Sequence, residues 1–326
     1  MSEYGSEEET KKEPPKEAPG KKFFLSHANS YEGQALFKEL WNKEKCREPE
    51  LAAHSFVGTI KKDETNPRGG FMEAPLGFEK FVDFQRTKEF RENLLACDVI
   101  VYDLMSNDYE EVDYVIKTLK TSDLQEEKTL VLLSSVMTWV NTPPKFQEEK
   151  PEGEEEGAEE EEEAEEEEEE ENSEAEAEGA EGEGGDEKEE ELDENGEPIV
   201  VKKPIFFKES DHHLRVPHAK FQHLKTLETL AMSSVNTQPK LKVHVLCSGI
   251  RYGNGERTFH QHFKQAWLQD PHELPYIGKG DNLVPTIHII DLARLVRRVV
   301  VEKPDTQHPY IFAIDKTKRP TQKRRV

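Results

Sequence analysis

"CDVIVYDLMSNDYEEVDYVIKTLKTSDLQEEKTLVLLSS", residues 97–135, holds two short apolar runs with an amphipathic segment between them. The runs at 98–104 and 129–135 are apolar enough, and short enough, to be buried strands. Residues 110–120 carry apolar side chains at the spacing of one helix face. Strands that alternate with helices are typical of a parallel sheet covered on both faces, so this stretch predicts an α/β fold.

The same alternation continues toward both ends of the chain. On the N-terminal side it predicts strands at 23–26 and 55–61, a helix at 34–45, and a short strand followed by a helix within 79–97. On the C-terminal side it predicts, in order, a helix at 218–234, a strand at 242–250, a helix at 257–269 with Phe259, Phe263 and Trp267 on one side, a strand running into a helix within 285–303, and a strand at 309–315. We therefore expect a doubly wound parallel sheet with a small C-terminal lobe.

The formal net charge of −25 comes from one segment of the chain. Residues 151–200 contain 29 Asp and Glu and one Lys, a net charge of −28, so the remaining residues sum to +3. Such a composition predicts disorder and interrupts the folded pattern. The expected parts of the chain are a charged arm at 1–20, a first half-domain at 21–146, a disordered acidic insert at 147–198, a second half-domain at 199–315 and a basic tail at 316–326.

Cysteine and histidine positions give no sign of a metal site. Cys97 and Cys247 stand in apolar segments, as expected for buried, reduced thiols. Four histidines gather in one region without acidic or cysteine partners at ligand spacing: His212, His213, His218 and His223. The polar N-terminus lacks a signal peptide, and no run approaches the ~20 apolar residues of a membrane helix. We expect a cytoplasmic protein without membrane contact.

The most specific motifs lie in the second half of the chain. An apolar strand is followed by a Tyr-Gly pair, a helix, a Leu-Pro pair, a Gly-x-Gly turn and an Ile-His-x-x-Asp-Leu-Ala segment, here Tyr252-Gly253, Leu274-Pro275, Gly278 with Gly280, and Ile287 to Ala293. This order resembles the extended short-chain dehydrogenases/reductases of the nucleotide-sugar epimerase type. The resemblance implies a Rossmann-like domain.

A narrower resemblance rests on three strings. "CDVIVYDL", "LLSSVMTWV" and "HQHFKQAWLQDPHELPYIGKGDNLVPTIHIIDLA" are similar to the reductase-like N-terminal domain of the isoform-seven family of ciliary and flagellar adenylate kinases. In that family the kinase domain follows the reductase-like domain. This chain has no G-x-x-x-x-G-K-[ST] loop, so we expect no kinase site within it.

The turn after the first strand departs from the dinucleotide-binding pattern. In "FFLSHANSYEG", residues 23–33, the resemblance places His27 and Ser30 where the family has its first two glycines, and Gly33 at the third. Side chains at the first two positions obstruct the approach of a pyrophosphate. We expect no resident cofactor, and NAD(P) or an adenine nucleotide remains as the alternative.

The catalytic positions of the family are also altered. Its Tyr-x-x-x-Lys pair corresponds to His218 and Gln222, and Thr138 lies near the position of its catalytic hydroxyl. A glutamine cannot replace the ammonium that lowers the tyrosine pKa. His288 and Asp291 are expected to have structural roles rather than to act in catalysis. Asp291 can cap the helix that follows it or bind backbone amides there.

These residues predict a noncatalytic binding or scaffold module. By resemblance it would act in the axoneme of cilia or flagella, in a protein linked to adenine nucleotide balance. The expected partners are axonemal proteins, including tubulin through the basic tail, and not nucleic acid. The alternatives are an active NAD(P)-dependent reductase or epimerase and a nucleotide-sensing domain.

Overall fold

The computed structural model describes residues 20–41, 54–61, 75–148, 202–255, 258–269, 278–280, 282–302 and 309–316. Two compact units are present: Met1–Thr142 together with Lys208–Val326, and Pro143–Phe207. The arm, insert and tail expected from the sequence lie almost wholly outside the described residues. The larger unit contains every element of the main sheet.

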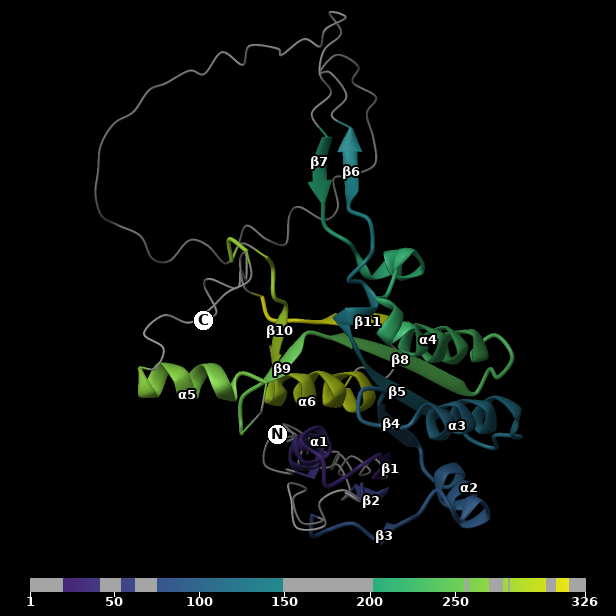
Figure 1. Ribbon diagram of the computed structural model, residues 1–326. Coiled ribbons are helices and arrows are strands. Elements are labelled where there is room, and N and C mark those ends of the chain that lie inside the picture. The colour runs from purple at the N-terminus through teal and green to yellow at the C-terminus, as the bar shows by residue number, and fades with distance from the viewer. Residues whose placement is uncertain are drawn as a thin grey trace, which may run out of the picture. The chain divides into compact units, whose positions relative to one another are not determined.

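Seven parallel strands form that sheet in the order β11-β8-β5-β4-β1-β2-β3 (Figure 1). Their bounds are β1 (Lys22–Leu25), β2 (Ser55–Gly58), β3 (Lys80–Phe81), β4 (Val99–Asp103), β5 (Lys128–Ser135), β8 (Leu241–Ser248) and β11 (Tyr310–Ala313). The order reverses beside β1, which pairs with β2 on one side and with β4 on the other. This arrangement confirms the predicted Rossmann-like, doubly wound sheet.

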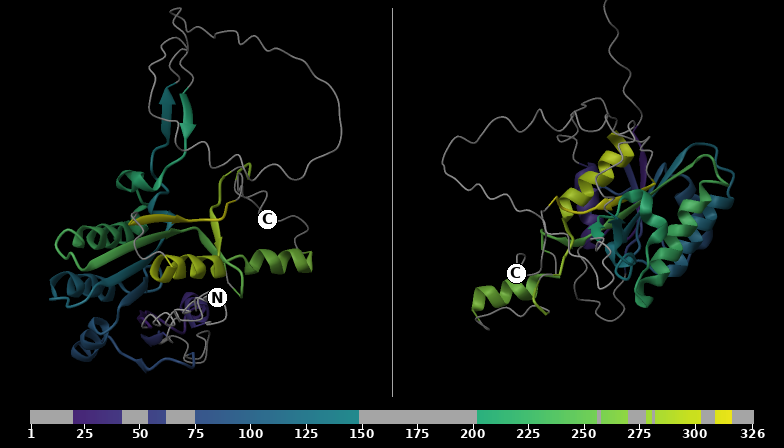
Figure 2. Two further views of the ribbon diagram at one scale, coloured as in Figure 1. Left: turned by 180° about the vertical axis from the view of Figure 1, so that it is seen from behind. Right: turned by 90° about the horizontal axis from the view of Figure 1, so that it is seen from above.

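Helices cover both faces of the sheet (Figure 2). The helices α1 (Tyr31–Trp41) and α6 (Ile289–Arg297) share one apolar core with residues of β1, including Phe23 and Leu25. The helices α2 (Thr87–Leu95), α3 (Tyr109–Thr121) and α4 (Gln222–Ser234) share the core on the opposite face. Because both faces are buried, the central strands are mostly apolar, as in β4, where all five residues are buried and only the last, Asp103, is charged.

Both cysteines that the structure describes, Cys97 and Cys247, are buried and unpaired, as predicted. Burial raises the pKa of each thiol to about 12. None of the helices in the described part of the chain has the length and apolar character needed to cross a bilayer.

Some elements differ from the prediction. Helix α1 begins at Tyr31, three residues before the expected start, and its expected end falls outside the described residues. Helix α5 (His260–Leu268) is present but buries none of its residues, and the side chains of Phe263 and Trp267 are 65% and 88% exposed. Figures 1 and 2 show α5 extending away from the sheet and from both cores, which is why its apolar side stays uncovered.

Two small sheets were not expected, although one of their strands, at Thr286–His288, is the short strand predicted within 285–303. The strands β9 (Ile250–Tyr252) and β10 (Thr286–His288) form a parallel pair within the larger unit. The second unit contains the antiparallel hairpin of β6 (Lys145–Glu148) and β7 (Lys202–Ile205). The residues between β6 and β7 include most of the acidic segment.

Candidate functional site

The crevice at the carboxyl ends of β1 and β4 is where a sheet of this topology places its ligands, because the strand order reverses there. The turn after β1 is fixed by hydrogen bonds to the neighbouring strands. Ala28 N donates to Thr59 O at 2.8 Å, and Asn107 Nδ2 donates to Ser26 Oγ at 3.0 Å. The turn is therefore held between the ends of β2 and β4 before it enters α1.

His27 and Ser30 stabilise this turn with their own atoms. His27 adopts a left-handed backbone conformation with φ of 45°, and its backbone N donates to Thr59 Oγ1 at 2.8 Å. Ser30 Oγ accepts the backbone N–H of Gly33 at 3.0 Å, as a helix N-cap does. One of the amides that would face an anion at the start of α1 is thus already paired.

Gly33 is required by packing. A Cβ added to it would lie 2.4 Å from the carbonyl oxygen of His27 and 2.9 Å from Cα of Ala28. Both neighbours are backbone atoms of the turn, so they cannot move aside as a side chain could. This close contact of helix and turn accounts for the glycine without any ligand.

Arg251 fills the crevice beside the start of α1. Its Nη1 lies 3.0 Å from Glu32 Oε1 and its Nη2 lies 2.8 Å from Asp103 Oδ1, while its Nε donates to Ser248 Oγ at 3.2 Å. The Arg251 side chain is only 9% exposed. Burial lowers the pKa of Arg251, but the carboxylates of Asp103 and Glu32 raise it further, above its ordinary value, so the guanidinium stays charged.

A dinucleotide bound across the start of α1 does not fit these residues. Ser30 already pairs the Gly33 amide, Tyr31 Oη donates to the carbonyl of Gly253, and Arg251 is held by two carboxylates. The pyrophosphate of such a cofactor would need that space and those donors. The usual mode of NAD(P) binding is therefore blocked by side chains of the chain itself.

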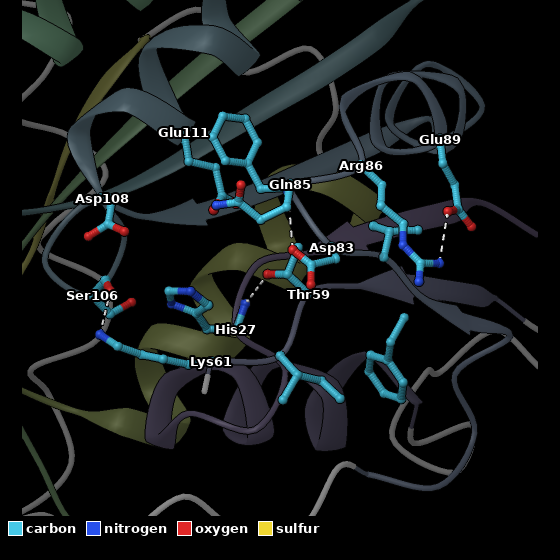
Figure 3. A pocket seen from close by; sticks show the side chains of 14 residues that line it. His27, Thr59, Lys61, Asp83, Gln85, Arg86, Glu89, Ser106, Asp108 and Glu111 are labelled. Atoms are coloured by element: carbon cyan, nitrogen blue, oxygen red, sulfur yellow. Dashed lines mark hydrogen bonds and ion pairs between the residues drawn. The ribbon is translucent and has the colours of Figure 1, made fainter. Parts of the chain in front are cut away.

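An open cleft of about 740 Å³ remains on the other side of His27 (Figure 3). Its wall includes apolar residues from the ends of β2 and β3 and a set of charged groups: Lys61, Asp83, Arg86, Glu89, Asp108 and Glu111. Lys61 Nζ donates to Ser106 O at 2.8 Å, and Glu89 pairs with Arg86 and with Lys80. Figure 3 shows the His27 ring between Lys61 and Gln85.

His27 is one of three buried polar residues that line this cleft, with Thr59 and Glu111. It is 9% exposed, and within the described residues its Nδ1 has no hydrogen-bond partner. Burial, with a further contribution from Lys61, lowers the pKa of His27 to about 4. The ring is therefore neutral near pH 7.

Each of the three positions that correspond to the family's catalytic residues makes a local hydrogen bond that involves the backbone. Thr138 is fully buried and its Oγ1 donates to Ser135 O at 3.0 Å. His218 is exposed, and its Nδ1 accepts the backbone N–H of Lys220 at 3.2 Å. Gln222 begins α4, where its carbonyl accepts from Thr226 Oγ1. Across the described residues, no hydrogen bond joins any two of Thr138, His218 and Gln222.

A buried ion pair that the sequence did not predict joins Arg215 to Glu228 of α4. Glu228 Oε2 lies 2.7 Å from Arg215 Nε, and Ser134 Oγ donates to Glu228 Oε1. Burial raises the pKa of Glu228, although Arg215 and Ser134 lower it. The sequence feature that could have indicated this pair is the position of Glu228 on the apolar face of a helix, four residues after the buried Leu224. The hydroxyl of Ser134 is thus engaged in the core.

The N-cap of α6 differs from the prediction. Asp291 does not cap α6; its Oδ1 accepts from Arg294, and the cap is His288, whose Nδ1 accepts the backbone N–H of Ile290 at 3.3 Å. That prediction was wrong because the helix begins two residues before Asp291.

In the described part of the chain, no group of three or more His, Cys, Asp or Glu is arranged to hold a metal ion.

Sequence comparison relates the chain to one kind of protein. It is 24% identical to Adenylate kinase 7 of Mus musculus over 225 residues, 68% of this chain and 28% of that protein. It is 36% identical to Adenylate kinase 7 of Macaca fascicularis over 78 residues, 24% of this chain and 14% of that protein. The matched part thus spans less than a third of either relative. No protein-family profile matches the chain.

Solved structures share the fold. A dTDP-glucose 4,6-dehydratase from Bacillus anthracis in complex with NAD gives a TM-score of 0.52 at 11% identity, covering 92% of this chain and 78% of that one. A UDP-glucuronic acid 4-epimerase from Bacillus cereus in complex with NAD gives 0.52 at 14% identity, covering 93% and 80%. The solved structures show the Rossmann-like fold that the first resemblance implies, and the sequence matches confirm the similarity to adenylate kinase 7.

Proposed function

We propose that this chain is a noncatalytic Rossmann module that serves as a binding or scaffold domain in a protein of the adenylate kinase 7 type. The similarity to Adenylate kinase 7 over 68% of the chain supports the assignment to that kind of protein. By the same similarity, we propose that it acts in cilia or flagella, in a protein linked to adenine nucleotide balance. Both proposals concern a whole protein, and this chain matches 28% of the mouse relative.

One observation carries the noncatalytic assignment. The crevice that would hold a dinucleotide is filled by Arg251, Glu32 and Tyr31, and these side chains are paired with one another or with backbone. A reductase or epimerase of this fold needs its cofactor there. In addition, His218 faces solvent, and Gln222 cannot supply the charge of a lysine.

A turnover assay tests this proposal. The folded chain is incubated with NADH or NADPH and a set of nucleotide sugars and carbonyl compounds, and the nicotinamide absorbance is followed. We expect no change above buffer. Turnover that is lost in His218→Ala but kept in His213→Ala, a change at another exposed histidine, would show an active enzyme and refute the proposal.

The open cleft supports a second candidate function, nucleotide sensing. Its volume of about 740 Å³ suits a small ligand, since such pockets measure roughly 300–1,000 Å³. His27 lines the cleft as a neutral ring, and the lining does not include Arg251, Glu32 or Asp103. By its size the cleft would take a single nucleotide rather than a dinucleotide. Its cations are Lys61 and Arg86, and the four carboxylates beside them oppose the charge of a phosphate, so this alternative ranks below the scaffold role.

For the scaffold role, the proposed partners are axonemal proteins. The tail at 316–326 carries Lys316, Lys318, Arg319, Lys323, Arg324 and Arg325, which would favour an acidic surface such as that of tubulin. This contact would weaken with salt, because it depends on exposed charges.

A further inference from the structure

Three charged side chains meet in the crevice at the start of α1. Arg251 comes from β9, Glu32 from the first turn of α1, and Asp103 from the end of β4. The two ion pairs measure 3.0 and 2.8 Å, and the side chains of Arg251 and Asp103 are 9% and 6% exposed. One guanidinium thus joins three segments that are distant in the sequence.

The charge of this cluster is unfavourable for an anion. Two carboxylates and one guanidinium sum to −1, and within the described residues Asp103 Oδ2 has no hydrogen-bond partner. The positive end of the helix dipole already faces the carboxylate of Glu32. The backbone N–H of Gly33 already donates its hydrogen bond to Ser30 Oγ. A diphosphate would therefore meet excess negative charge at the place where this fold ordinarily offers donors.

We infer that Glu32 and Asp103 determine the ligand specificity of the crevice: they hold the guanidinium of Arg251 in two ion pairs, and with a cluster charge of −1 they exclude the diphosphate of a dinucleotide from the start of α1. The fold thereby keeps a cation at the start of α1 without a cofactor. Arg251 also links α1 to β4 and β9. The inference rests on the proposed absence of a dinucleotide, but its test needs no turnover.

The same geometry predicts what happens when the carboxylates lose their charge. In the variant Glu32→Gln/Asp103→Asn the cluster changes from −1 to +1, while Arg251 stays beside the start of α1. An arginine without carboxylate partners is a strong ligand for phosphate oxygens. Inorganic diphosphate should then bind where the wild type rejects it.

The experiment measures thermal unfolding of the wild type and this variant over a range of inorganic diphosphate concentrations. We expect diphosphate to raise the Tm of the variant, with an apparent affinity at least roughly tenfold higher than that of the wild type. Adding Arg251→Met to the variant should abolish the response. Glu32→Gln alone, at the more exposed of the two carboxylates, should show the same rise in Tm at a higher diphosphate concentration. This single variant replaces the double variant in the test if the double variant does not fold.

The matched control removes two carboxylates from surface ion pairs. In Glu79→Gln/Asp113→Asn the partners are Lys22 and Lys117, so the net charge changes equally but away from the crevice. The control should respond to diphosphate as the wild type does. Folded crevice variants that respond no more than this control, or a response that persists after Arg251→Met, would overturn the inference. Turnover with NADH or NADPH would refute the proposed function instead, so the two failures are distinguishable.

Discussion

Arg215→Met should lower the free energy of unfolding by roughly 3–5 kcal/mol, because it leaves the carboxylate of Glu228 buried without its counter-ion. The side chains of Arg215 and Glu228 are 2% and 0% exposed, so water cannot replace the lost partner. Arg215 Nη2 also donates to Thr229 Oγ1 at 3.0 Å, and the guanidinium lies over the ring of Tyr310. The variant therefore loses a buried contact as well as a charge.

Urea denaturation of three variants tests this result. The double variant Arg215→Met/Glu228→Met should recover most of the loss, because two apolar side chains can replace a buried ion pair at little cost. Glu127→Gln breaks the exposed pair with Lys242 and should cost less than about 1 kcal/mol. A loss of under about 1 kcal/mol for Arg215→Met would contradict the buried pair that the structure shows.

Acidification should destabilise the fold through His27 by about 1.4 kcal/mol for each pH unit between 6.5 and 4, or about 3 kcal/mol in all. The folded-state pKa of His27 is lowered to about 4 from 6.5, so in this window the unfolded chain binds a proton that the folded chain does not. Stability is therefore complete above pH 6.5 and is lost as the pH falls toward 4.

The measurement compares urea denaturation of the wild type and His27→Asn at pH 7.5 and 5.5. Asparagine accepts the left-handed φ of 45° and does not titrate in this range. The wild type should lose about 1.4 kcal/mol more than the variant on acidification. His213→Asn, at an exposed histidine, serves as the control and should behave as the wild type. Equal pH dependence in the wild type and His27→Asn would refute a buried neutral His27.

Much of the sheet could be predicted from the sequence. The strands β4 and β5 were placed within one residue at each end, because both faces of these strands are buried and their apolar runs end sharply. Helix α3 was also predicted closely, since its buried Val112, Val115, Ile116 and Leu119 repeat at helical spacing. The start of α1 was missed because it is set by the Ser30 cap, and not by an apolar residue.

The contents of the crevice could be predicted only in part. The sequence showed that His27 and Ser30 replace two glycines, but it could not show that Arg251 fills the remaining space. Arg251 and Glu32 are 219 residues apart, and nothing local marks them as partners. The β6–β7 hairpin was missed because its strands are short and rich in lysine, without the alternation typical of a half-buried strand.

The central claim is that the chain keeps a dinucleotide-binding fold whose crevice its own side chains have closed. Isothermal titration of the folded wild-type chain with NAD⁺ and NADPH, and with AMP in a separate run, tests it most directly. The account predicts no saturable heat with either dinucleotide, whether or not AMP binds in the cleft beside His27. Saturable binding of NAD⁺ or NADPH at micromolar concentration would contradict it, because the ligand could enter only by displacing Arg251 from Glu32 and Asp103.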